Sequence, residues 1–279
     1  MKQNVAKFGL SVALATAGIG LLASTANAQL QPGYTIIGKD SATQLEDIFV
    51  HADVGVAYEV GTVGNPGFWD LHIHIDTPGL GYAEEYAPDE ALLYLSDDTR
   101  RTLAADFDFL GATAGQTVWL IPAANPSPSP INWLGIGAEE NAPGDFTGSV
   151  TLSLLSVTGF NGSAAPGQFA VWQPDGLGGN NVLMSTVPGS TAADFITLAV
   201  GDHDHYNWGF TAPGFYEVTF EAIGTPADGG PASSGPVTYY FGVETLGPPN
   251  LGAAAPEPGT LALAVAGLAG FAWIKRRRA

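Results

Sequence analysis

The 279-residue chain contains no cysteine. An exported fold of this size must therefore be held together by its hydrophobic core and not by disulfides. Metal sites built from thiolates are excluded for the same reason. Histidine and carboxylate side chains are left as the available metal ligands.

Basic residues are also scarce. Six of the nine lie close to the two ends of the chain, so residues 29–255 contain only Lys39, Arg100 and Arg101 against 26 acidic residues, a formal charge of −23. Such a field repels nucleic acid and anionic lipid surfaces and attracts dissolved cations. The alternative is that the acidity only keeps an exported protein soluble.

Amphipathic helical stretches are lacking between the two ends. The 37 glycines and 20 prolines instead separate short β-rich runs, among them residues 68–76, 91–95, 117–121, 215–223 and 237–243. This spacing predicts an all-β domain, an antiparallel β-sandwich of the immunoglobulin-like or jelly-roll-like kind. We expect one such domain over residues 47–246, after a polar lead-in at 29–46 and before a Pro/Gly/Ala linker at 247–255.

The N-terminus has the pattern of a secretory signal peptide over residues 1–28. Lys2 and Lys7 form the basic start, an apolar run follows over residues 8–22, and Ala26-Asn-Ala28 is a small-x-small cleavage site. The mature chain is expected to begin at Gln29.

The C-terminal segment, residues 256–279, has three parts. Pro256-Glu-Pro258 precedes an apolar helix over residues 261–274, and Lys275-Arg-Arg-Arg278 closes the chain. The helix is shorter than the ~20 residues of a full membrane span, and the basic cluster would stay cytoplasmic. The whole resembles the PEP-CTERM sorting signal of Gram-negative bacteria. That resemblance implies a transient membrane anchor, cleavage by an exosortase, and release to the cell surface or exopolysaccharide. An ordinary single-pass anchor is the alternative.

The chain has five histidines, and four of them form two His-x-His pairs. His72 and His74 lie in one alternating run, His203 and His205 lie in another, and His51 stands alone. In a strand, residues two apart point to the same face, so each pair would present two imidazoles together. The pattern favours a metal site over five unrelated solvent-facing side chains.

We expect all five imidazoles to converge on one ion, with Asp53, Asp70 and Asp76 completing the site or orienting the rings. Three or four neutral imidazoles suffice for tetrahedral zinc. Cu²⁺ and Ni²⁺ suit the same ligands.

Several phrases resemble one family of bacterial surface proteins, those with a choice-of-anchor M domain. The phrases are His51-Ala-Asp53, Pro166-Gly-Gln-Phe-Ala-Val-Trp172, and residues 201–216 with the sequence GDHDHYNWGFTAPGFY. The segments at 69–74, 88–91 and 133–140 further resemble a PEP-CTERM branch of that family, described as repressed by the zinc-uptake regulator. The resemblance covers residues 45–245 and implies a zinc context without naming a reaction. Asp202 and Asp204 depart from the small or apolar residues more usual beside such histidines.

Three functions are consistent with these observations. The leading hypothesis is an exported, surface-associated metal-binding protein, not an enzyme, that acquires or buffers zinc under zinc limitation, with a metal-uptake system or exopolysaccharide as partner. A zinc hydrolase is a second, in which Glu84, Glu85, Glu139 or Glu140 would serve as base. The chain has neither a His-Glu-x-x-His nor a Gly-x-Ser-x-Gly motif. The third is a structural or adhesive matrix module whose histidines bind nothing.

Overall fold

The computed structural model describes residues 29–38, 49–62, 64–77 and 83–249. The expected signal peptide, most of the lead-in and the C-terminal segment lie outside these residues. Among the residues described, no helix is both long and apolar enough to pass through a membrane. The prediction of an all-β fold is confirmed, since the described helices are three 3-10 turns: η1 (Asp97–Thr99), η2 (Asp108–Leu110) and η3 (Phe160–Gly162).

The largest sheet has six strands in the order β1-β5-β16-β15-β9-β12. Its long antiparallel strands pair through β15, whereas β1, β5 and β16 run parallel. The strands are β1 (Thr35–Ile37), β5 (Ala91–Leu95), β9 (Val150–Thr158), β12 (Phe195–Leu198), β15 (Gly214–Ile223) and β16 (Ser233–Val243).

A second sheet contains all five histidines and is called here the histidine sheet. Its order is β13-β8-β2-β3-β4, with β2 and β8 parallel and the other pairs antiparallel. The strands are β2 (His51–Glu59), β3 (Phe68–Ile75), β4 (Glu85–Tyr86), β8 (Trp133–Gly137) and β13 (His203–His205).

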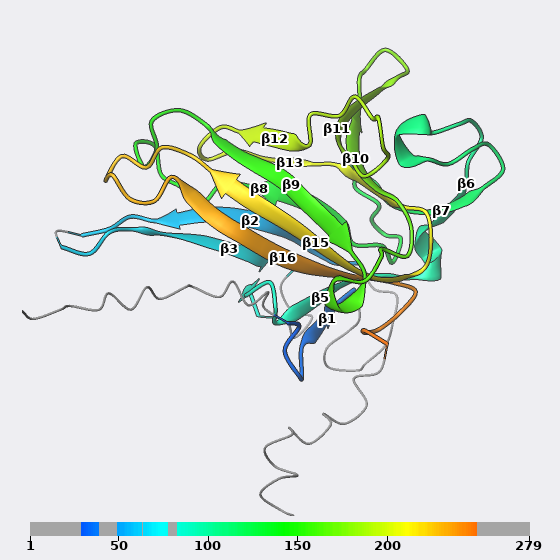
Figure 1. Ribbon diagram of the computed structural model, residues 1–279, viewed down its shortest axis with the longest axis horizontal. Coiled ribbons are helices and arrows are strands. Elements are labelled where there is room, and N and C mark those ends of the chain that lie inside the picture. Colours follow the sequence, from blue (N-terminus) through cyan, green and yellow to red (C-terminus); the bar gives the residue numbers. More distant parts are fainter. Residues whose placement is uncertain (1–28, 39–48, 63, 78–82, 250–279) are drawn as a thin grey trace, which may run out of the picture.

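A third, antiparallel sheet has the order β11-β10-β14-β7-β6. It is formed by β6 (Arg100–Thr102), β7 (Thr117–Ile121), β10 (Phe169–Pro174), β11 (Asn180–Ser185) and β14 (Asn207–Phe210). Figure 1 shows this sheet at one end of the molecule, beyond the stacked strands of the other two.

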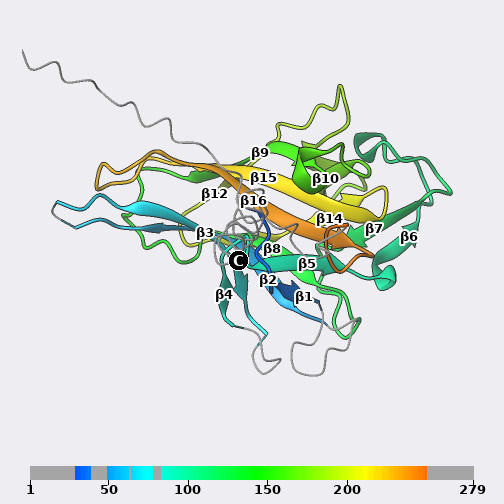
Figure 2. The ribbon, with the colours of Figure 1, turned by 60° about the horizontal axis from the view of Figure 1, so that its bottom comes forward.

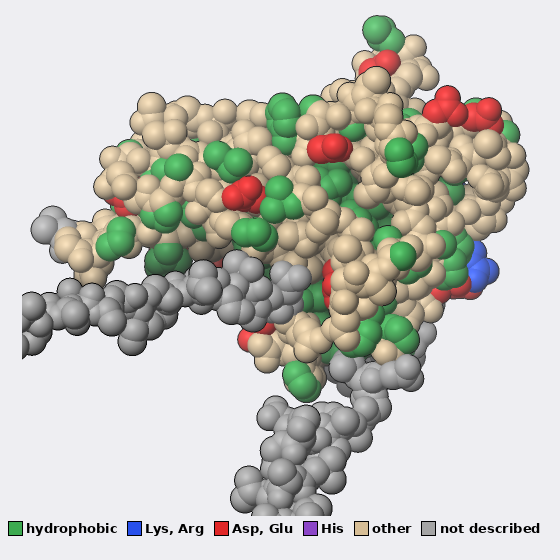
Figure 3. Space-filling view, in the orientation of Figure 1, with side chains coloured by type: hydrophobic (Ala, Val, Ile, Leu, Met, Phe, Trp, Pro, Cys, Tyr) green, Lys and Arg blue, Asp and Glu red, His purple; other side chains and the backbone are tan. Residues whose placement is uncertain are grey.

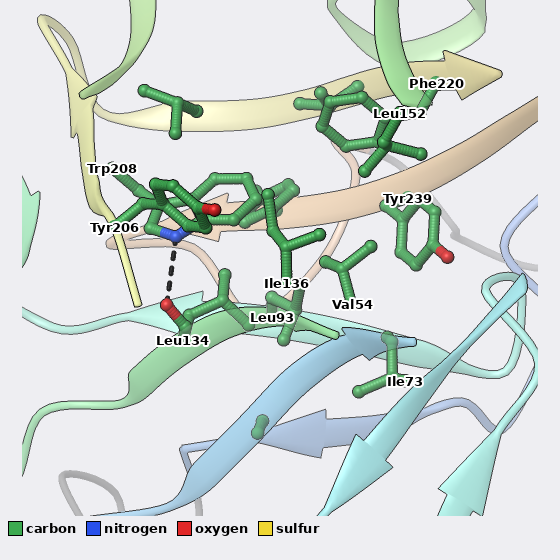
Figure 4. Packing of buried hydrophobic residues seen from close by; sticks show 14 of the residues in the cluster. Val54, Ile73, Leu93, Leu134, Ile136, Leu152, Tyr206, Trp208, Phe220 and Tyr239 are labelled. Carbon is green, nitrogen blue, oxygen red and sulfur yellow. Dashed lines mark hydrogen bonds between the residues drawn. The ribbon is translucent and has the colours of Figure 1, made fainter. Parts of the chain in front are cut away.

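The main core lies between the six-stranded sheet and the histidine sheet. Figures 1 and 2 show β15 and β16 layered over β2 and β3. In Figure 4, Val54, Ile73 and Ile136 point from the histidine sheet toward Phe220 and Tyr239, and all five side chains are at most 1% exposed. Burial of this many apolar side chains is the main force holding the two layers together.

Trp208 closes one end of this core. Its ring is fully buried, and its indole N–H donates to the carbonyl oxygen of Leu134 at 3.1 Å (Figure 4). Because Leu134 lies in β8, this hydrogen bond ties the third sheet to the histidine sheet while satisfying the one polar atom of the indole.

Most of the expected strands are present, with shifts of a few residues in their bounds. The runs at 91–95 and 117–121 form strands with those bounds, but β16 begins at Ser233, four residues before the expected start at Val237. Pro236 is tolerated because β16 meets its other neighbour, β5, only from Tyr240 onward. The proline therefore lies where one side of the strand is an edge.

The described residues form three sheets, where the sequence predicts a two-sheet sandwich. A simple immunoglobulin-like or jelly-roll-like topology stays a prediction. The face of the molecule in Figure 3 carries scattered acidic side chains, with basic side chains only at one edge, near β6. This distribution agrees with the strongly negative charge read from the sequence.

Candidate metal centre

The candidate site lies on the outer face of the histidine sheet. Alternation along β2 turns Val54 into the core and Asp53 outward, and alternation along β3 turns Ile73 inward and His72 and His74 outward. The prediction that His72 and His74 share one face of a strand is therefore confirmed.

Strand register places the key side chains in rows. One row crosses all five strands and contains His205, Gly135, Asp53, His74 and Glu85. Directly paired residues lie about 4.5–5.5 Å apart, so this row brings two imidazoles and two carboxylates into line from four segments of the chain.

The next row contains His203, Gly137, Gly55 and His72. Its two glycines and Gly135 leave a part of the outer sheet surface without side chains, which is called here the glycine floor. A Cβ at Gly55 would lie 2.3 Å from His72 Nε2, and one at Gly135 would lie 2.0 Å from Asp53 Oδ1. Any larger residue at these positions would displace the candidate ligands.

The first donor set consists of His51, Asp53, His203 and His205, whose ligand atoms all lie within 4.8 Å of one another. The Nε2 atoms of His51 and His205 are 3.2 Å apart. Two nitrogens bound to one tetrahedral zinc at 2.0–2.1 Å would be separated by about 3.3 Å. The pair therefore already has the spacing that one ion requires.

Trp133 holds the rings of this set in place. Its indole stacks on His205 with ring centroids 3.6 Å apart and planes 9° from parallel, and it stacks on His51 at 4.7 Å. The indole N–H donates to the carbonyl oxygen of Ala123 at 3.0 Å, and this hydrogen bond fixes the position of the Trp133 ring itself.

The second donor set consists of His72, His74, Glu85 and Glu140, again within 4.8 Å of one another. Glu140 is the shared partner: its Oε1 lies 3.1 Å from His72 Nε2 and 3.2 Å from His74 Nδ1. His72 is almost fully buried, and its Nδ1 atom has no hydrogen-bond partner.

Two further carboxylates lie between the sets. Asp53, Asp76 and Glu139 form a third group of close oxygens. Asp76 faces both sets, with Oδ1 at 2.9 Å from His74 Nε2 and Oδ2 at 3.6 Å from His51 Nδ1. Glu139 reaches His203, with Oε2 at 3.3 Å from its Nδ1. The two sets are therefore contiguous.

The electrostatics of the first set favour a bound cation. Burial, reinforced by the negative charge of Glu139, raises the pKa of Asp53 to about 7. Burial also lowers the pKa of His51, and together with the neighbouring His51 and His203 it lowers the pKa of His205 to about 4. These imidazoles are consequently neutral at pH 7, the form that binds metal.

His74 behaves differently. Burial lowers its pKa, but the hydrogen bond and charge of Asp76 and the charge of Glu140 outweigh burial, so the net pKa is raised. A small cavity of about 10 Å³ lies between the sets, lined in part by Asp53, His74 and Glu139. Its size is on the order of a single water or ion.

Of the eight residues proposed from the sequence, Asp70 is the one outside these groups. It lies 3.9 Å from His72 Nδ1, beyond hydrogen-bond distance. Glu85, Glu139 and Glu140 join the groups, although the sequence suggested them only as bases of a hydrolase. Asp204 is turned to Gln173, whose Nε2 donates to its Oδ2 at 2.8 Å.

Fold and site together define an all-β protein that presents a histidine and carboxylate face on one sheet. Residues 254–278 match the PEP-CTERM protein-sorting motif. No curated protein and no solved structure matches the chain. The tail marks the protein for export, a transient anchor in the membrane and recognition by an exosortase-type sorting enzyme on the way to the cell surface.

Proposed function

We propose that this surface protein binds divalent metal, zinc above all, on the outer face of the histidine sheet. The observation that carries the proposal is the state of Asp53. Its side chain is 1% exposed, and neither carboxylate oxygen has a hydrogen-bond partner. A buried carboxylate without a donor is costly, and a cation held by Asp53 and the imidazoles of its set would offset that cost.

Zinc fits the donor set best among the common divalent ions. Three imidazoles and one carboxylate match its tetrahedral preference. Magnesium and calcium instead prefer oxygen ligands alone. Copper(II) and nickel(II) accept the same imidazoles, so competition among the three ions decides the metal.

The physiological role that we propose is zinc acquisition or buffering outside a Gram-negative cell under zinc limitation. It rests on the resemblance to choice-of-anchor M proteins of the zinc-regulated PEP-CTERM branch, together with the two groups of histidine and carboxylate side chains on the histidine sheet. The partners in this role would be a metal-uptake system or the exopolysaccharide to which the protein is sorted.

Metal content per chain tests the proposal. Protein purified without added metal should contain stoichiometric zinc, or take it up from a zinc solution and hold it against a weak chelator. His51→Ala combined with His205→Ala should remove the zinc held by the first donor set, because both nitrogens belong to that set. Copper(II) and nickel(II) titrations under the same conditions then rank the three ions.

Asn181→Ala is a suitable control, since this exposed residue lies on β11 of the third sheet. It should bind metal as the natural chain does. A folded natural chain that binds none of the three ions would refute the proposal and leave the structural or adhesive matrix module as the function.

A further inference from the structure

We infer that the histidine sheet binds two metal ions per chain, one in each donor set, with Asp76 between them. This inference rests on the proposed metal binding and assigns a second site. The first set offers three imidazoles and one carboxylate, and the second offers two of each.

The number of ligands argues against one shared ion. The two sets together hold eight candidate ligands without overlap, whereas zinc in proteins takes four. Each set alone already supplies four donor atoms within 4.8 Å of one another. A single ion in the first set would leave His72, His74 and Glu140 without a role.

The second set also has its own buried, unpartnered polar atom. His72 is 3% exposed, and its Nδ1 atom has no hydrogen-bond partner. The ring of His72 fits only because Gly55 on the paired strand has no side chain, since a Cβ at position 55 would lie within 2.7 Å of three ring atoms. The chain therefore gives up a side chain on β2 to accommodate an imidazole on β3.

Asp76 connects the two sites. Its two oxygens point to different sets, Oδ1 to His74 and Oδ2 to His51. Carboxylates in this position commonly orient the rings of ligating histidines. Asp53 and Glu139 complete the negative charge between the sites.

The two sites differ in access. In the first set Asp53 and His205 are buried and His203 is 39% exposed, while in the second set only His72 is buried. The second site is therefore the more accessible of the two and should exchange its ion faster.

Native mass spectrometry of the purified protein with zinc alone tests the inference. We expect two zinc ions per chain. The pair His72→Ala and His74→Ala should leave one, and the pair His51→Ala and His205→Ala should also leave one. Asp76→Asn should retain both ions but lower the zinc affinity of each site by about tenfold or more. Asp202→Asn, an exposed neighbour of the first set, is the matched control.

The milder changes Asp53→Asn and the pair Glu85→Gln and Glu140→Gln repeat the test without removing a ring, in case the alanine variants fail to fold. One zinc per chain, lost in either set of variants, would mean a single shared ion and overturn the inference while the proposed function stands. No bound zinc at all would overturn both.

Discussion

Replacing Asp53 with asparagine should stabilise the metal-free protein and at the same time remove the zinc held by the first donor set. The pKa of Asp53 is raised from 3.8 to about 7 by burial, with Glu139 adding to the shift. Between these values the folded state binds more protons than the unfolded state, so stability falls as pH rises through that window. Above pH 7 the ionised carboxylate carries the full cost.

The magnitude follows from the shift. A difference of about three pKa units corresponds to about 4 kcal/mol. Burying the neutral asparagine amide itself costs about 1 kcal/mol. Asp53→Asn should therefore raise the free energy of unfolding by about 3 kcal/mol at pH 8. For a domain of this size, that is a rise in Tm of about 6–12 °C.

The assay is thermal unfolding of chelator-treated protein at pH 5 and pH 8, each with and without zinc. At pH 5 the natural carboxyl is already protonated, so the advantage of the variant should nearly vanish. Zinc at pH 8 should raise the Tm of the natural chain more than that of the variant, because the variant keeps only the second donor set. Asp202→Asn removes the same charge at an exposed position and should do neither.

Two results would refute this reasoning. The first is a variant that is less stable than the natural chain at pH 8 without metal. The second is a gain in stability of equal size at pH 5 and pH 8, since ionisation of Asp53 would then not be its cause.

Zinc affinity should fall as pH drops below about 7, because protons then compete with zinc for Asp53, while His205 with its pKa of about 4 stays neutral. Chelator competition from pH 8 to pH 5.5 measures this affinity, and a flat profile would contradict the prediction. Gly55→Ala should push the ring of His72 aside and cost about 1–3 kcal/mol of stability, as overpacking does. It should also lower the number of zinc ions bound per chain. Thermal unfolding measures the first effect and native mass spectrometry the second, and an unchanged Tm and zinc count would show that the glycine floor is not required. Protein released from its natural host should begin at Gln29 and lack the apolar segment after the PEP triplet, and intact mass that includes this segment would count against cleavage.

The sequence by itself determined the strands and the direction of the histidines. Glycine and proline interrupt alternating runs, and a period of two is a local property that needs no tertiary contact. For this reason the strands at 91–95 and 117–121, and the shared face of His72 and His74, could be read in advance. The sorting tail could be read for the same reason, since its three parts are contiguous.

Only the tertiary structure decided which ligands meet. Convergence of all five imidazoles on one ion requires the two His-x-His strands to lie close together, but β8 and β2 lie between them in the same sheet. That spacing divides the histidines between two donor sets, and the parallel pairing of β2 with β8 brings Asp53 beside Gly135. The positions of the ligands depend on the register of strands from four segments that are distant in sequence. No local sequence pattern encodes that register.

The carboxylates show the same division. Glu85 enters the second set because the two-residue strand β4 pairs it with His74, and Glu139 and Glu140 enter because the chain leaves β8 beside both sets. An acidic residue in a loop is ordinarily a solvated side chain, so no pattern in the sequence favours these three glutamates over Asp70. Ligand identity here depends on which backbone edges pair, and pairing is a property of the whole sheet.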